Sequence, residues 1–163
     1  KPTFYIANID DSEQAAKNLK ELESIANELG SSVIPASIKI EQEISLLKED
    51  EKLEYLELLN MDEPVLNKII FEGYKLLGLK TYFTAGPKEI RAWTIRDGFT
   101  APNAAGVIHT DFERGFIKAE VIDFKDFIAC NGESGAKEKG KLRLEGKEYL
   151  VKDGDVIHFK FNV

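Results

Sequence analysis

The sequence of 163 residues is poor in the features that mark secreted and membrane proteins. Its only cysteine is Cys130, which excludes an internal disulfide and fits a reducing compartment. It has no apolar run near the ~20 residues of a membrane-spanning helix, and no charged-then-apolar leader at its start. These absences exclude disulfide-stapled and helical membrane classes, and we expect a cytoplasmic protein with no membrane partner.

Histidine is also scarce, with His109 and His158 as the only two copies. A metal site needs three or four convergent ligands, and no cysteine lies near either histidine in the sequence. No Ser-His-Asp pattern has supporting context either. We therefore expect no metal site and no catalytic residue in this chain. His109 is interpreted as a residue that hydrogen-bonds a turn, with contact to a partner as the alternative.

Charge is distributed unevenly along the chain. Residues 1–78 carry 8 Lys against 16 Asp and Glu, a net charge of −8, whereas residues 79–163 carry 14 Lys and Arg against 13 acids, a net charge of +1. Such an asymmetry indicates two surfaces with different partners, or simply an acidic, solvated helical half. At 43% hydrophobic residues, the chain can bury a core in one domain or two small ones.

The first half alternates short apolar runs with helical periodicity. Residues Thr3–Ala7 and Ser32–Ala36 are predicted to be buried strands, and apolar positions repeat at helical spacing between them. A strand, helix and strand of these lengths predict a βαβ unit with a parallel sheet. Two further helical stretches are predicted: 41–59, with a break over 48–52, and a helix that Glu63-Pro64 opens and Gly78 ends.

The period changes to two beyond a boundary at about residue 79. This pattern predicts strands over 82–85, 89–95, 116–122 and 156–161, with a hairpin across Gly86-Pro87. Phe124–Ala129 is predicted to be a short helix or turn.

Three segments of the second half are similar to one known domain: Thr81–Ile95, Thr100–Phe116 and Val151–Val163. They resemble the TGS domain that ends the Obg-like ATPases of the YchF family, and the opening Lys1–Asp11 resembles the base-recognition strand late in a P-loop NTPase domain. The resemblance implies an α/β plus α+β architecture. Residues 1–79 would be the C-terminal part of a P-loop NTPase domain of the OBG type, with its parallel sheet and acidic helices. Residues 80–163 would be a ubiquitin-like β-grasp TGS domain.

The resemblance also implies a function. Members of the family are translation-associated, ribosome-binding switches that hydrolyse ATP or GTP with Mg²⁺. Because no phosphate loop is evident, we expect this chain to be a C-terminal piece that holds no nucleotide tightly and does not hydrolyse it alone. The alternatives are a non-enzymatic TGS-containing module that binds RNA or protein, and a structural interaction unit.

Two loops are similar to the base-binding loops of such NTPases. Asn8-Ile-Asp-Asp11 stands where GTPases carry Asn-Lys-x-Asp, with Ile9 in place of the lysine. YchF-like proteins usually have Glu at the last position, so Asp11 leaves the choice between ATP and GTP open. Ser37-Ile-Lys follows the second strand like a Ser-Ala-Lys loop. The resemblance places Asn8, Ile9, Asp11, Ser37 and Ile38 around the base, although each loop alone also fits a plain helix cap or turn.

The segment Gly135–Leu142 comes close to a second nucleotide motif. It nearly spells the phosphate loop G-x-x-x-x-G-K-[ST]. Leu142 replaces the hydroxyl that would bind Mg²⁺, no apolar strand precedes the segment and no clear helix follows it. We reject it as a phosphate loop.

The same stretch is rich in cations. If it is extended, four of them share one face and can bind the phosphates of the ribosome or of another structured RNA: Lys137, Lys139, Lys141 and Arg143. An edge strand protected by lysine is the alternative. Arg91 and Arg96 flank Trp93, which either belongs to the core or adds a stacking surface for RNA. Protein partners of the TGS domain are a further expectation.

Overall fold

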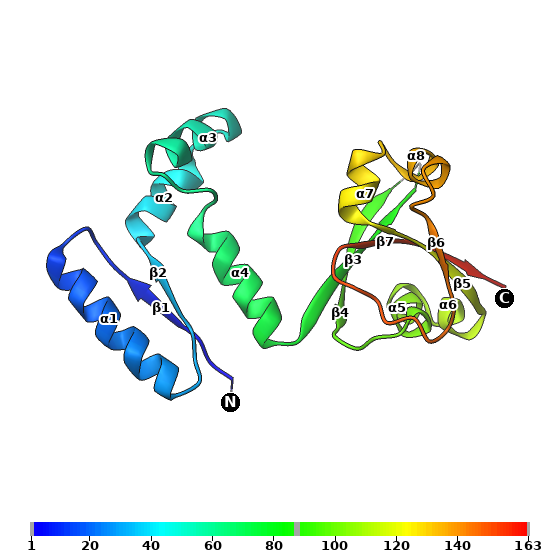
Figure 1. Cartoon of the computed structure of the whole chain (residues 1–163), viewed down its shortest axis with the longest axis horizontal. Coiled ribbons are helices and arrows are strands. Elements are labelled where there is room, and N and C mark those ends of the chain that lie inside the picture. Colours follow the sequence, from blue (N-terminus) through cyan, green and yellow to red (C-terminus); the bar gives the residue numbers. More distant parts are fainter. Residues whose placement is uncertain (1, 87–88, 163) are drawn as a thin grey trace. The chain divides into compact units, whose positions relative to one another are not determined.

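The computed structural model describes residues 2–86 and 89–162, which fall into two compact units (Figure 1). Unit 1 ends at Leu77 and unit 2 begins at Gly78. This division lies close to residue 79, where the sequence changes from helical to alternating periodicity. None of the helices in the described residues combines the length and the hydropathy that a membrane span requires.

Unit 1 begins with a βαβ segment. Strand β1 (Tyr5–Asn8) pairs in parallel with β2 (Val33–Ala36), and helix α1 (Glu13–Glu28) connects them. Ser12 starts α1, because its Oγ accepts a hydrogen bond from the Ala15 backbone N–H at 3.1 Å. The remainder of unit 1 consists of helices: α2 (Ile38–Leu46), α3 (Glu49–Leu58) and α4 (Val65–Leu76).

The predicted parallel βαβ unit is present, but the prediction that its first strand is buried is wrong. The side chains of Tyr5 and Ile6 are 36% and 47% exposed. Strand β1 pairs only with β2 among the described residues, so the two-stranded sheet covers little of either face. Strand β2 is more buried than β1, because Ile34 and Ala36 both lie in the interior.

The predicted break over residues 48–52 is also misplaced. The helices separate at Leu47 and Lys48, and α3 already begins at Glu49. Glu51 accepts a hydrogen bond from the Lys48 backbone N–H at 3.0 Å, and three acidic residues lie in the first turn, where the helix dipole favours them. The acidic run therefore starts a helix instead of interrupting one.

Helix α4 is capped by a side chain from a distant part of the sequence. Pro64 precedes the helix and provides no side-chain cap. The Glu41 carboxylate of α2 accepts hydrogen bonds from the backbone N–H groups of Val65, at 2.8 Å, and Leu66, at 3.1 Å. A carboxylate at this end satisfies two otherwise unpaired donors and complements the helix dipole, so it joins α2 to α4.

Unit 2 is built on a five-stranded sheet of order β4-β3-β7-β5-β6. Strand β3 is antiparallel to β4 and parallel to β7, while β5 is antiparallel to β7 and β6. The strands are β3 (Leu79–Ala85), β4 (Ile90–Arg96), β5 (Phe116–Asp123), β6 (Arg143–Glu145) and β7 (Asp155–Phe161). The four predicted strands are confirmed; Pro87 of the predicted hairpin turn lies outside the described residues.

Helices cover both faces of this sheet (Figure 1). They are α5 (Ala101–Ile108), α6 (Thr110–Arg114), α7 (Phe124–Ala129) and α8 (Glu133–Glu138). The main core lies between the sheet and α5, where Tyr82 is fully buried and donates from its hydroxyl to the Ala104 carbonyl at 2.9 Å. A smaller cluster of Ile122, Cys130 and Ala136 lies on the other face, under α7 and α8.

Candidate functional site

The two loops singled out in unit 1 meet at one edge of the sheet. Because β1 and β2 are parallel, Asn8 lies beside Ala36, and the Ile9 backbone N–H donates to the Ala36 carbonyl at 2.9 Å. The Asn8 Oδ1 atom accepts a hydrogen bond from the Ile38 backbone N–H at 3.2 Å. This bond connects the last residue of β1 directly to the first turn of α2, the helix that follows β2.

A hollow of about 600 Å³ adjoins this edge and the face of α1 that follows it. Asn8, Ile9 and Ser37 line it, as expected for residues around a shared ligand. Asp11 and Ile38 are exposed and are not among the described residues that line it. Further lining side chains come from Asp10, Ser12, Gln14, Asn18 and Lys39. The structure therefore brings three of the five expected base-side residues together and leaves the other two at the rim.

Local hydrogen bonds fix the shape of both loops. Asp10 Oδ1 accepts a bond from the Ser12 backbone N–H at 3.0 Å, and hydrogen bonds from Ser12 lower the pKa of the Asp10 carboxyl below its ordinary value. Ser37 caps α2, with its Oγ accepting from the Ile40 backbone N–H at 3.5 Å. Ser37 thus caps α2, while the cap of α1 is Ser12, the residue after Asn8-Ile-Asp-Asp11, and both caps line the hollow.

The prediction of one extended basic face over residues 137–143 is wrong. Lys137 lies in α8, Lys139 ends that helix, and Gly140 turns the chain with a φ of 67°. Gly135 permits the close packing of α8, because a Cβ there would overlap the Cys130 carbonyl oxygen. The glycines of the rejected phosphate-loop match therefore serve helix packing and a turn.

Arg143 is part of an internal network. Its guanidinium lies 3.5 Å from Asp155 Oδ1 and 3.2 Å from Glu145 Oε1. Asp155, only 2% exposed, also accepts hydrogen bonds at 2.8 Å from the Tyr149 hydroxyl and the Lys152 backbone N–H. Burial, together with the bond to Asp155, raises the pKa of Tyr149. Arg143 thus compensates a buried carboxylate, which gives it a structural role.

The other cations occupy different surfaces. Lys141 lies 3.2 Å from Asp126 in an exposed pair. The Arg91 guanidinium lies 4.3 Å from the centre of the Trp93 ring, whose Nε1 donates to Thr84 Oγ1 at 3.0 Å. Trp93 is half-buried against the core and also stacks with a cation. Arg96 is an odd number of residues from Arg91, so it points to the opposite face of β4.

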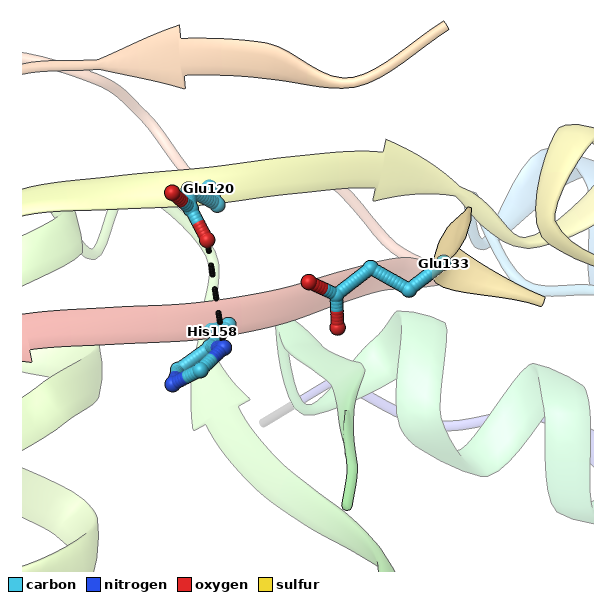
Figure 2. A group of neighbouring side chains, drawn as sticks. All are labelled: Glu120, Glu133 and His158. Atoms are coloured by element: carbon cyan, nitrogen blue, oxygen red, sulfur yellow. Dashed lines mark ion pairs between the residues drawn. The ribbon is translucent and has the colours of Figure 1, made fainter. Parts of the chain in front are cut away.

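His109 has the structural role expected for it. It is the cap of α6, and its Nδ1 accepts a hydrogen bond from the Asp111 backbone N–H at 3.1 Å. A different group, formed by Glu120, Glu133 and His158, was not expected from the sequence (Figure 2). Glu120 and His158 come together because the register of β5 and β7 places them opposite each other. Their spacing along the sequence does not reveal that register.

The fold and the site define a class of protein. The chain is an α/β protein with a parallel βαβ segment and a mixed sheet, and its hollow lies at the carboxyl ends of parallel strands, where nucleotide-binding sheets hold their ligands. The sequence model YchF-GTPase_C, described as "Protein of unknown function (DUF933)", matches residues 79–162. The chain belongs to the YchF family.

The matches to other proteins extend over the whole chain. It is 58% identical over 164 residues to "Ribosome-binding ATPase YchF" of Pasteurella multocida and 57% identical to the protein of that name from Haemophilus influenzae. Both matches cover 100% of this chain but 45% of the relative, so the chain spans less than half of each relative's length. A solved structure, "Structure of the Schizosaccharomyces pombe YchF GTPase", matches 98% of this chain and 43% of that one, with 37% identity and a TM-score of 0.83.

Proposed function

We propose that this chain is the base-side and ribosome-contacting part of a nucleotide-hydrolysing switch that acts on the cytoplasmic ribosome. The names of its relatives support a ribosome-binding NTPase. The relatives are more than twice as long as this chain, which leaves room in them for the phosphate-binding half. ATP or GTP with Mg²⁺ would bind in the longer protein. The chain alone is expected to hydrolyse neither, because its only near-match to a phosphate loop is a helix followed by a turn.

The observation that carries this proposal is the hydrogen bond between Asn8 Oδ1 and the Ile38 N–H. It fixes two loops that follow neighbouring parallel strands, so that both border one hollow. Ile9 offers an apolar surface for the face of a base, while Asn8 and Ser37 offer polar groups for its edge. Asp11 and Ile38, at the rim, complete the base site when a nucleotide is bound.

The choice of base rests on Asp11. A carboxylate here accepts hydrogen bonds from the N–H donors of guanine, which adenine does not present in the same arrangement. The relatives' names differ on this point, with an ATPase in Pasteurella multocida and a GTPase in Schizosaccharomyces pombe. Asp11 is exposed between the lining residues Asp10 and Ser12, and it adds a preference for guanine if it faces the base.

Unit 2 would be the TGS domain, with a ubiquitin-like β-grasp fold. The support is topological: an opening hairpin β3-β4, then helix α5, and a last strand β7 that enters the middle of the sheet parallel to β3. Its RNA contacts would come from the exposed Lys137, Lys139 and Lys141, with Arg91 on another surface. Protein partners of this unit are a second expectation.

Nucleotide affinity in the longer protein tests the base site. Asn8→Ala removes the acceptor that joins the loops and should weaken both ATP and GTP about tenfold, the consequence of one lost hydrogen bond of roughly 1.4 kcal/mol. Asp11→Ala should weaken GTP more than ATP. Asn27→Ala, on α1 and away from the hollow, is the matched control.

Four results would count against the proposed function. If Asn8→Ala left the affinity for nucleotide unchanged, Asn8 would not contribute to binding of the base. If Asp11→Ala lowered the affinities for ATP and GTP equally, Asp11 would not select guanine. Phosphate release by the 163-residue chain above a no-protein control would show that hydrolysis does not need the rest of the longer protein. Ribosome binding by a longer protein that hydrolyses neither nucleotide would favour the non-enzymatic module.

A further inference from the structure

Two potential metal ligands face each other on neighbouring strands of unit 2. Glu120 on β5 lies directly opposite His158 on β7, and His158 Nδ1 is 3.9 Å from Glu120 Oε2. Their strand neighbours Ala119 and Val121 are buried in the core under α5. Because side chains alternate along a strand, Glu120 and His158 point to the opposite face of the sheet, the face on which α7 and α8 lie.

A third ligand reaches this pair from another element. Glu133, in the first turn of α8, extends its carboxylate toward the pair (Figure 2). One ligand atom from each of the three side chains lies within 4.8 Å of the others. The same three residues line a hollow of about 10 Å³, roughly the space that one water-sized occupant needs. The hollow lies at the cluster, and its other lining residues are apolar.

We propose that Glu120, Glu133 and His158 form a binding site for one divalent transition-metal ion of the zinc class. An imidazole nitrogen with two carboxylate oxygens suits Zn²⁺, Co²⁺ or Ni²⁺, whereas Mg²⁺ and Ca²⁺ prefer oxygen ligands alone. Ligands about 2.0–2.2 Å from a tetrahedral ion are roughly 3.4 Å apart. The side chains therefore close by about 0.5 to 1.5 Å on binding, which the exposed Glu133 and His158 allow. Water completes the coordination.

Lys160 at present occupies part of this site. Its Nζ lies 3.2 Å from Glu120 Oε2 and 3.5 Å from His158 Nε2. The ammonium and the metal ion compete for the same carboxylate, so Lys160 lowers the affinity of the site. Its removal should tighten metal binding.

Metal binding would connect α8 to the two strands β5 and β7. An ion that binds only the folded protein raises the free energy of unfolding with ligand concentration. Metal binding would thus stabilise α8, the helix that contains Lys137. It also departs from the sequence-based expectation of no metal site.

Zinc titration of the 163-residue chain tests the proposal. Calorimetry should show one saturable Zn²⁺ site in the wild type. Glu133→Gln and His158→Gln should each weaken it at least tenfold, since loss of mere outer-shell partners costs about 10–100-fold. Lys160→Met should bind several-fold more tightly. Mg²⁺ at the same concentration should neither bind nor displace Zn²⁺.

His109→Gln is the matched control. His109 Nδ1 also lies near a carboxylate, 3.4 Å from Asp111 Oδ2, but no third ligand joins that pair among residues 2–86 and 89–162. This variant should retain wild-type Zn²⁺ affinity within about twofold. Absence of a saturable site in the wild type, equal losses in His109→Gln and His158→Gln, or equal binding of Mg²⁺ would each overturn the proposal. Zinc should raise the melting temperature of the wild type and Lys160→Met, and not that of His158→Gln.

Discussion

The two units differ in how completely they bury their apolar side chains. Unit 1 places 14 of the 21 exposed large hydrophobic side chains of the described residues on its surface, although it is the shorter unit. Its buried hydrophobic residues are few: Ala26, Ile34, Ala36, Ile44 and Leu56. Unit 2 has a continuous core of 11 buried residues between its sheet and α5. Unit 1 also carries the acidic excess of −8, against +1 for unit 2.

This difference indicates that the two units are stabilised in different ways. A two-stranded sheet with one connecting helix has too little area to form a closed core, whereas five strands with helices on both faces bury enough. Unit 2 has an apolar core of its own, whereas unit 1 leaves much of its apolar surface exposed. We therefore expect unit 1 to be the less stable of the two.

The largest effect should come from truncating the core of unit 2. Ile157 is 2% exposed, and Ile157→Ala should lower the free energy of unfolding of unit 2 by about 3 kcal/mol. Trp93, the only tryptophan, reports this transition by fluorescence in urea. Leu53→Ala in unit 1, where the side chain is 68% exposed, should shift the helical transition seen by circular dichroism by under about 0.5 kcal/mol.

Equal losses of unfolding free energy in the two variants would contradict the difference between the units, because they would mean that unit 1 buries Leu53 as tightly as unit 2 buries Ile157. One shared transition for both probes would also contradict it. Unit 1 should unfold first, and unit 2 should retain its fluorescence change at higher urea.

A smaller effect should distinguish the tyrosines of the two units. Burial raises the pKa of Tyr82, so the folded state keeps its hydroxyl neutral after the unfolded chain begins to ionise near pH ~10. The stability that this group contributes is present below about pH 10 and is lost as the pH rises further. Tyr82→Phe should therefore show a smaller decrease in stability between pH 9 and pH 11, and should cost about 1 kcal/mol at neutral pH through the lost bond to Ala104.

Tyr55 in unit 1 provides the comparison for this measurement. Its pKa is also raised, chiefly by the hydrogen bond to Glu43, but it lies on the surface. Tyr55→Phe should leave the pH dependence of unit 2 unchanged. A Tyr82→Phe variant whose unfolding depends on pH as strongly as the wild type would show that the buried hydroxyl is not the titrating group.

The elements that were predicted correctly have strong periodicity or local signals. The strands of unit 2 follow from alternation, and the meeting of Asn8 with the loop at Ser37 follows from two parallel strands of similar length. Helix caps such as Ser12 are local, so the sequence contains them directly. The meeting of the two loops at one hollow was therefore predictable in outline, although the positions of Asp11 and Ile38 at its rim were not.

The misses have physical causes. Helix α5 was not predicted, because Pro102 and Gly106 are typical of turns and its buried residues Ala101, Ala104 and Ala105 are small. Lysines at alternate positions from 137 to 141 fit a strand over so short a window, yet close packing at Gly135 selects a helix. The cluster of Glu120 and His158 depends on strand register, a tertiary property.

Ribosome co-sedimentation of the chain tests the central claim, that unit 2 contacts RNA through its exposed lysines, most directly. Lys137, Lys139 and Lys141 are replaced by Ala together, and Arg143 is kept because its loss would leave the buried Asp155 unpaired. The matched control removes the same charge from unit 1, at Lys17, Lys20 and Lys68.

The triple change in unit 2 should reduce ribosome binding and flatten its salt dependence by roughly 2 to 3 units in the log–log slope, about one per lost phosphate contact. The control variant should bind like the wild type. Unchanged binding in the unit 2 variant, or equal losses in both variants, would contradict the claim that unit 2 holds the ribosome through these lysines.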